Sequence, residues 1–181
     1  MKIVSRPVSG VIVLEPQVFI DDRGFFLESF EQARYKELGI EEQFIQENHS
    51  RSSRGVLRGL HFTRVRPQAQ ILTVIRGHIF DVVVDLRSGS SSFGKWFGTE
   101  LSDEGPRQIY MARGFAHGFC VLSDFADLHY KVSERYAVTD QEGLRWNDPD
   151  IAVKWPVKNP IISIKDKSRD FIRSISPIEN L

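Results

Sequence analysis

The chain has 181 residues, a typical length for one domain and long enough to bury a core without disulfide support. Apolar residues make up 41% of the chain and charged residues 27%, which is the balance of a soluble globular protein and excludes a disordered one. The 24 Lys and Arg residues equal the 24 Asp and Glu residues and form no basic block. We therefore expect no nucleic-acid or membrane partner and predict a small-molecule ligand.

Cysteine usage and the N-terminal residues indicate a reducing compartment. The only cysteine, Cys120, can form neither an internal disulfide nor a zinc knuckle, and we interpret it as a core thiol. Residues 1–16 contain only short apolar runs, which match neither a signal peptide nor a membrane span. We expect a cytoplasmic protein.

Short β-branched or aromatic runs alternate along the chain with clusters of Gly, Pro, Asp and Ser, a pattern typical of an all-β sandwich or barrel. Residues 11–14 predict a strand. The sequence at 21–24 predicts a turn, with 25–30 as the returning strand of a hairpin. Residues 31–38 predict a helix that ends at Gly39.

The centre of the chain gives the clearest strand signals. Residues 70–75 and 79–86 predict two strands connected by 76–78. In the second strand the apolar side chains alternate, which predicts that only the face with Phe80, Val82, Val84 and Leu86 is core. Further strands are predicted at 107–111, 118–122 and 127–132. After Gly143, a Trp- and Pro-rich stretch predicts an ordered segment that lies over the barrel, with a short helix.

These elements predict an all-β protein, a double-stranded β-helix (the jelly roll of the cupins) with short peripheral helices, formed as a single domain by residues 1–181. An immunoglobulin-like sandwich is the weaker alternative, because the paired cysteines that flank a buried Trp are missing. A jelly roll can hold a ligand in its mouth.

Histidines are the first candidates for chemistry. No His-x-His pair is present, although many cupins bind a metal with one, so we predict no metal site. By its spacing alone, His61 is interpreted as a hydrogen-bonded core histidine. Strand alternation places Arg58 on the opposite face from His61 unless Gly59 forms a bulge. His117, between two glycines, fits a turn histidine and a ligand contact equally well.

Several longer motifs occur in a fixed order. They are Arg58-Gly59-Leu60-His61-Phe62, residues 79–87 (IFDVVVDLR), 92–96 (SFGKW), 114–119 (GFAHGF), 130–131 (YK), 146–149 (WNDP), 155–156 (WP) and 165–166 (KD). Together they closely resemble the dTDP-4-dehydrorhamnose 3,5-epimerase family over about residues 11–166, and this ordered set is far more specific than any one motif.

The resemblance implies a metal-free, cofactor-free cupin that acts on a nucleoside-diphosphate 4-keto-6-deoxyhexose. It implies that His61 is the base, that Asp166 hydrogen-bonds the far nitrogen of His61, and that Tyr130 is the proton donor. Substrate contacts are implied at the remaining matching positions: Arg23, Glu28, Gln46, Asn48, Arg58, Gln70, His117, Tyr136, Glu142, Trp146 and Lys165.

One of these positions departs from the family pattern. The family carries a lysine seven residues before the glycine at 77, where this chain has Gln70. That lysine is thought to stabilise the enolate oxygen, and a neutral amide is a weaker electrostatic partner. We therefore expect inversion at C3 alone rather than at C3 and C5.

Three functions are compatible with these residues: a sugar-nucleotide epimerase, a 3,4-ketoisomerase of such a sugar, and a non-catalytic sugar-nucleotide binding protein. Retention of His61, Tyr130 and Asp166 together favours the epimerase. Family members also exchange N-terminal strands, so we expect a homodimer.

Overall fold

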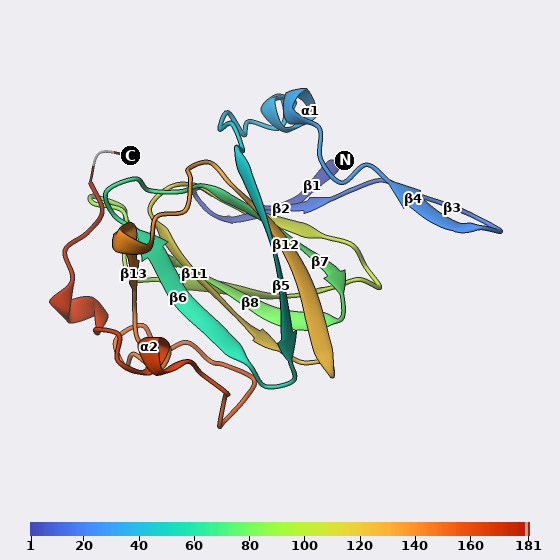
Figure 1. The fold of residues 1–181 in the computed structure, drawn as a ribbon. Coiled ribbons are helices and arrows are strands. Elements are labelled where there is room, and N and C mark those ends of the chain that lie inside the picture. Colours follow the sequence, from blue (N-terminus) through green and yellow to red (C-terminus); the bar gives the residue numbers. More distant parts are fainter. Residues whose placement is uncertain (180) are drawn as a thin grey trace.

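The computed structural model, which describes residues 1–179 and 181, contains two antiparallel sheets that face one another (Figure 1). The larger sheet contains, in spatial order, β1 (Lys2–Val8), β2 (Val11–Glu15), β10 (Gln108–Met111), β7 (Gln70–Arg76), β12 (Phe125–Val132) and β5 (Gln46–Ser53). The smaller sheet contains β13 (Gln141–Gly143), β6 (Leu57–Thr63), β11 (Phe115–Val121), β8 (His78–Asp85) and β9 (Trp96–Ser102).

The chain crosses repeatedly between the two sheets. β5, β7, β10 and β12 belong to the larger sheet, whereas β6, β8, β11 and β13 belong to the smaller one. Such alternation between two antiparallel sheets is the topology of a jelly roll, so the predicted fold class is confirmed. None of the helices in the described part of the chain is long and apolar enough to cross a membrane.

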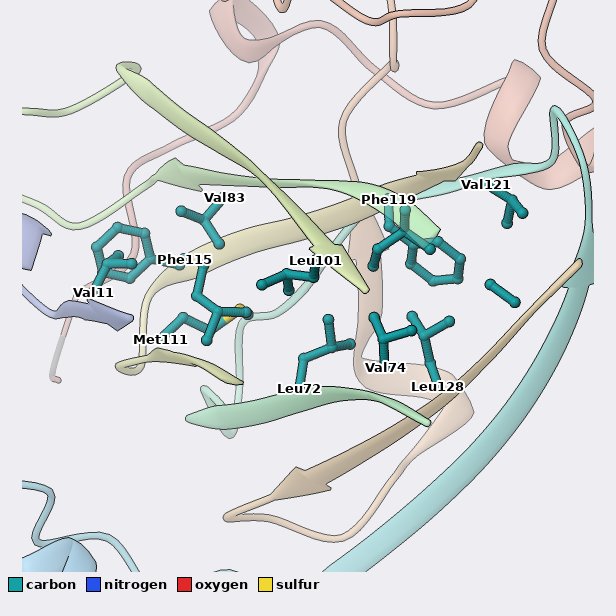
Figure 2. Close-up of a cluster of buried hydrophobic side chains, with 13 residues drawn as sticks. Val11, Leu72, Val74, Val83, Leu101, Met111, Phe115, Phe119, Val121 and Leu128 are labelled. Carbon is teal, nitrogen blue, oxygen red and sulfur yellow. The ribbon is translucent and has the colours of Figure 1, made fainter. Parts of the chain in front are cut away.

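Apolar side chains from both sheets fill the space between them. Figure 2 shows Leu72 and Val74 of β7 on one side of this core and Leu101 of β9 and Phe119 of β11 on the other. All four are at most 5% exposed, so the apolar residues of the facing strands hold the two sheets together.

Other segments pack on part of the outer face of each sheet. α1 (Gln32–Glu37) and its flanking loops pack on the larger sheet through Tyr35 and Ile40. The C-terminal segment packs on the smaller sheet, with Ile151, Ile172 and Ile178 in the core that it encloses. This segment contains α2 (Ile164–Lys167) and the 3₁₀ turn η2 (Ile172–Ser174), while the 3₁₀ turn η1 (Val138–Asp140) precedes β13.

The expectation of a one-sided strand at 79–86 is wrong. Val82 and Val84 contact the C-terminal segment, and Val83 faces the core between the sheets, so both faces of β8 are buried. Asp81 and Asp85 are fully buried too. The polar residues that alternate along this strand are therefore Asp81 and Asp85, which have partners inside the protein, His117 and Arg87, and do not form a face exposed to solvent.

The hairpin around residues 21–24 exists, but its strands differ from the expected ones. It is formed by β3 (Val18–Asp21) and β4 (Gly24–Leu27), which pair only with each other. Residues 11–14 instead lie within the larger sheet between β1 and β10, because their side chains are almost completely buried. Figure 1 shows the hairpin projecting away from both sheets.

Candidate active site

A cavity of about 330 Å³ lies between the two sheets. Its lining comes from six strands and from neighbouring loops. The larger sheet contributes Gln46, Asn48, Ser50, Gln70, Leu72, Tyr130 and Val132. The smaller sheet and the rim contribute Arg58, His61, Phe62, Thr63, His117, Phe119, Gln68, Tyr136 and Gln141.

A bulge in β6 brings Arg58 and His61 to the same cavity. His61 pairs with His117 of β11 and Arg58 pairs with Phe119, so β6 contains one extra residue over this interval. Gly59 has a φ of +124°, and a Cβ atom there would lie 2.5 Å from the Cα atom of Gly118. Only glycine fits this close approach. Arg58 and His61 can face the same cavity only if β6 contains a bulge at Gly59, and the structure contains this bulge.

His61 forms a hydrogen-bonded pair with Asp166. The His61 Nε2 atom lies 2.7 Å from Oδ1 of Asp166, which is 4% exposed. Burial opposes ionisation of Asp166, but the hydrogen bond and charge of His61, together with Ser163 and the charge of Arg169, outweigh it and lower the pKa of this carboxyl. An ionised Asp166 requires a proton on His61 Nε2. The lone pair of the ring is then on Nδ1, which is the arrangement of a general base.

Tyr130 lies on the opposite wall, on β12 of the larger sheet. Burial raises the pKa of its hydroxyl, with a weaker opposing effect from the charge of Arg58. Tyr130 therefore stays protonated at neutral pH. The cavity thus has a proton acceptor on one sheet and a proton donor on the other.

The rest of the lining suits an anionic ligand rich in hydroxyl groups. No Asp or Glu lines the cavity in the described part of the chain, and Arg58 forms no ion pair there. Arg58 donates instead to Ser52 Oγ and to the Arg51 carbonyl. Five amide side chains offer both donors and acceptors: Gln46, Asn48, Gln68, Gln70 and Gln141.

A second histidine and carboxylate pair lies beside the first. His117 lines the cavity and its Nε2 atom lies 2.6 Å from Oδ2 of Asp81, a fully buried residue of β8. His117 is within a strand and not in a turn, so the ligand-facing alternative for this residue matches its position. Among the described residues, no three His, Cys, Asp or Glu side chains form a group that could hold a metal ion.

Two further implied residues meet at the rim. The Tyr136 hydroxyl donates to Gln141 Oε1 over 3.2 Å, and Lys165 Nζ donates to the same oxygen over 3.1 Å. The Tyr136 amide donates to Gln46 Oε1. Gln141 therefore fixes both the aromatic wall and the cation at the entrance.

Five implied contacts do not line the cavity of this chain: Lys165, which reaches Gln141 at the rim, and the four residues that follow. Arg23, at the tip of the hairpin, pairs with Asp21, and Glu28 pairs with Arg34. Glu142 pairs with Arg64, and Trp146 lines a separate surface hollow with Trp155. Their substrate roles stay predictions.

The sequence reasoning missed several residues of this site. Asp81 could have been found, because a carboxylate within an apolar strand requires a partner. Ser50, Gln68 and Gln141 line the cavity without belonging to a motif that signals it. Their positions depend on strand pairing that a single sequence does not reveal.

Comparison with known proteins identifies the family. The sequence model described as dTDP-4-dehydrorhamnose 3,5-epimerase matches residues 5–174. The chain belongs to this family. A dTDP-4-dehydrorhamnose 3,5-epimerase from Methanothermobacter thermautotrophicus is 47% identical over 170 residues, with 92% of each chain covered. A dTDP-4-dehydrorhamnose 3-epimerase from Streptomyces niveus is 41% identical over 169 residues, with 92% of this chain and 82% of the relative covered.

A solved structure of the 3,5-epimerase family has the same fold. The dTDP-6-deoxy-D-glucose-3,5-epimerase of Legionella pneumophila, in complex with dTDP-4-keto-L-rhamnose, superimposes with a TM-score of 0.95 at 40% identity, and 99% of both chains is covered. The chain is thus a cupin-type isomerase that acts on a sugar nucleotide, as the ordered motifs predicted.

Proposed function

We propose that this epimerase acts on a dTDP-linked 4-keto-6-deoxyhexose and inverts C3 in preference to C5. The observation that carries the proposal is the pair of His61 and Asp166, 2.7 Å apart, on a cavity wall opposite the protonated hydroxyl of Tyr130. The names of the similar proteins from Methanothermobacter and Legionella support the dTDP-sugar class.

The reaction needs an acid and a base on the two faces of the sugar. His61 Nδ1 takes the proton from the carbon beside the ketone, and the electron pair of that C–H bond moves through the carbonyl to its oxygen, giving an enolate. Tyr130 then donates its proton to the opposite face of that carbon as the carbonyl re-forms. Solvent removes the proton from His61 and restores the one lost by Tyr130, so the enzyme returns to its starting state.

Asp166 and His117 complete this arrangement. Asp166 fixes the tautomer of His61 and stabilises the imidazolium that forms. His117 and Arg58 face the same cavity, and Arg58 supplies positive charge near the enolate and the diphosphate. Arg58 suits the diphosphate because its planar group can donate two parallel hydrogen bonds.

The preference for C3 follows from Gln70. It lines the cavity with a neutral amide, which must approach an enolate oxygen to about 2.7–3.2 Å to stabilise it. A lysine acts over a longer range and follows a ring that shifts between the two deprotonations. Gln70 therefore serves one ring position better than the other. The existence of a 3-epimerase among the similar proteins is compatible with this restriction.

The test follows deuterium from solvent. The protein is incubated in D₂O with a dTDP-4-keto-6-deoxyhexose, and label at C3 and C5 is mapped by NMR, with His61→Asn as the inactive control. We expect rapid label and inversion at C3 and slow label at C5, with Gln70→Lys raising the rate at C5. Absence of label at both carbons contradicts the epimerase, and a 3-keto product indicates the ketoisomerase instead. Equal labelling of C3 and C5 in the unmodified protein contradicts the C3 preference alone.

A further inference from the structure

Arg169 lies directly behind the pair of His61 and Asp166. Its Nε atom is 3.9 Å from Asp166 Oδ1, the oxygen that His61 also contacts. The Arg169 side chain is only 13% exposed and does not belong to the cavity lining. Any effect on a ligand must therefore pass through Asp166 and His61.

The backbone of β13 makes room for this guanidinium. Gly143 pairs directly with His61 across β13 and β6, and a Cβ atom on Gly143 would lie 2.9 Å from Arg169 Nε. Beside it, the Arg145 amide donates to the Asp170 carbonyl over 2.8 Å. The segment that carries Arg169 is thus fastened to the end of β13, with its side chain against the glycine.

The hydrogen bonds of Arg169 do not explain its burial. Its Nε and Nη2 atoms are buried and have no hydrogen-bond partner among the described residues, and Nη1 reaches the Gln141 carbonyl only at 3.5 Å. A guanidinium removed from water is unfavourable unless an opposite charge compensates for it. Asp166 is the only carboxylate within 4 Å of it in the described part of the chain.

We propose that Arg169 is a positioning residue of the active site. Its charge helps to keep the buried Asp166 ionised. It also weakens the attraction of Asp166 for a second proton on the His61 imidazole, so that His61 stays neutral and can act as a base. This inference rests on the proposed role of His61 as the base. The charge of Arg169 adds to the contacts of His61 and Ser163 that keep Asp166 ionised in spite of its burial, and an ionised Asp166 fixes the His61 tautomer. An uncompensated Asp166 charge, by contrast, would favour an imidazolium that cannot accept a proton.

Other charged or titratable groups also surround His61. His117 of β11 pairs with it in register and is itself bonded to Asp81. Arg58 of β6 and Tyr130 of β12 line the same cavity, and Lys165 of α2 contacts its rim. None of these groups is altered in the variants below. A difference between the variants in the His61 titration midpoint can therefore be attributed to Arg169.

The test compares Arg169→Met, which removes the charge, with Arg169→Lys, which keeps it. Two midpoints are measured: the acidic limb of the kcat/KM profile against pH, and the titration of the His61 imidazole by NMR, assigned with His61→Asn. Loss of a cation makes protonation of His61 easier, so both midpoints should rise by about 0.5–1 pH unit in Arg169→Met. They should stay close to the original values in Arg169→Lys, and the distant His78 should be unchanged in both.

Unchanged midpoints in a folded Arg169→Met protein overturn the proposal, as does an equal shift in Arg169→Lys. If Arg169→Met does not fold, Arg169→Gln has the same expected shift. If neither neutral variant folds, Arg169→Ala, which also removes the charge and leaves space beside Gly143, must give the same shift of the His61 midpoint. The NMR titration needs no substrate, so it tests Arg169 even if the labelling experiment finds no epimerisation.

Discussion

At the scale of single residues, different side chains of the cavity are expected to carry out proton transfer and binding. In the proposed mechanism His61 with Asp166 is the base, whereas Arg58, without a carboxylate partner in the described part of the chain, is a cation available to the ligand. His61→Asn should lower the labelling rate by about 10³-fold or more and change the Kd for dTDP by less than about twofold. Arg58→Ala should weaken dTDP binding by about tenfold. Calorimetry beside the labelling assay checks both; strong loss of dTDP binding in His61→Asn would contradict this division.

Tyr130 allows the two halves of the reaction to be separated. Deprotonation by His61 needs no hydroxyl on the far wall, whereas inversion needs a donor there. In Tyr130→Phe, we expect solvent label at C3 with retained configuration, and inverted product reduced by about 10²-fold or more. Product configuration is read by NMR, with Tyr136→Phe as the matched control at the rim. Unaffected inversion in Tyr130→Phe would assign the donor role to another group.

At the scale of elements, Asp85 at the end of β8 fastens the loop before β9. It accepts hydrogen bonds from Arg87, Ser90 and Ser92, and Arg87 also donates to the Ser9 carbonyl before β2. Burial alone would favour the protonated form, but these bonds lower the Asp85 pKa from 3.8 to about 2. The ionised carboxylate therefore stabilises the folded state above about pH 4, and this stabilisation is lost as the pH falls through 2.

Asp85→Asn should lower the free energy of unfolding at pH 7 by about 3 kcal/mol, because it leaves Arg87 without its buried partner. The difference from the unmodified protein should shrink between pH 4 and pH 2. Urea denaturation at several pH values measures it. The exposed ion pair of Asp124 and Arg54 gives the control, since Asp124→Asn should change stability by less than about 1 kcal/mol. A difference independent of pH would contradict this account.

The elements that the sequence predicted well are those with apolar alternation or dense β-branching. β7, β8 and β12 were found within a residue or two because burial determines their composition. β5 was missed because its residues are mostly polar: one face lines the cavity and the other is exposed. The motifs located His61, Tyr130 and Asp166 in the chain, but the bulge at Gly59 that turns Arg58 to the same cavity depends on contact with Gly118.

At the scale of the whole molecule, the β3 and β4 hairpin points to a second copy. Phe25, Phe26 and Ile20 are 71%, 68% and 82% exposed, and Arg23 at the tip does not line the cavity of its own chain. We predict a homodimer in which Arg23 completes the site of the partner. Light scattering should give twice the mass of the chain at micromolar concentration, and Phe25→Ser with Phe26→Ser should reduce it.

Mixing two inactive variants tests the shared site directly. In a heterodimer of Arg23→Ala and His61→Asn chains, one cavity has an intact His61 and receives an intact Arg23. Random exchange of subunits should therefore restore about a quarter of the original activity. Each variant alone should remain inactive. No recovery after exchange would contradict a site completed by the partner.

The C-terminal segment that covers the smaller sheet has a consequence for how activity arises during folding. It supplies Ile151, Ile172 and Ile178 to the core, and the same segment carries Asp166 and both Trp146 and Trp155. We therefore expect recovery of activity after dilution from urea to follow the fluorescence change of these tryptophans rather than the formation of sheet structure. A chain whose sheets have paired but whose C-terminal segment is still detached lacks the carboxylate behind His61. We therefore expect catalytic competence to be acquired when this segment docks on the smaller sheet.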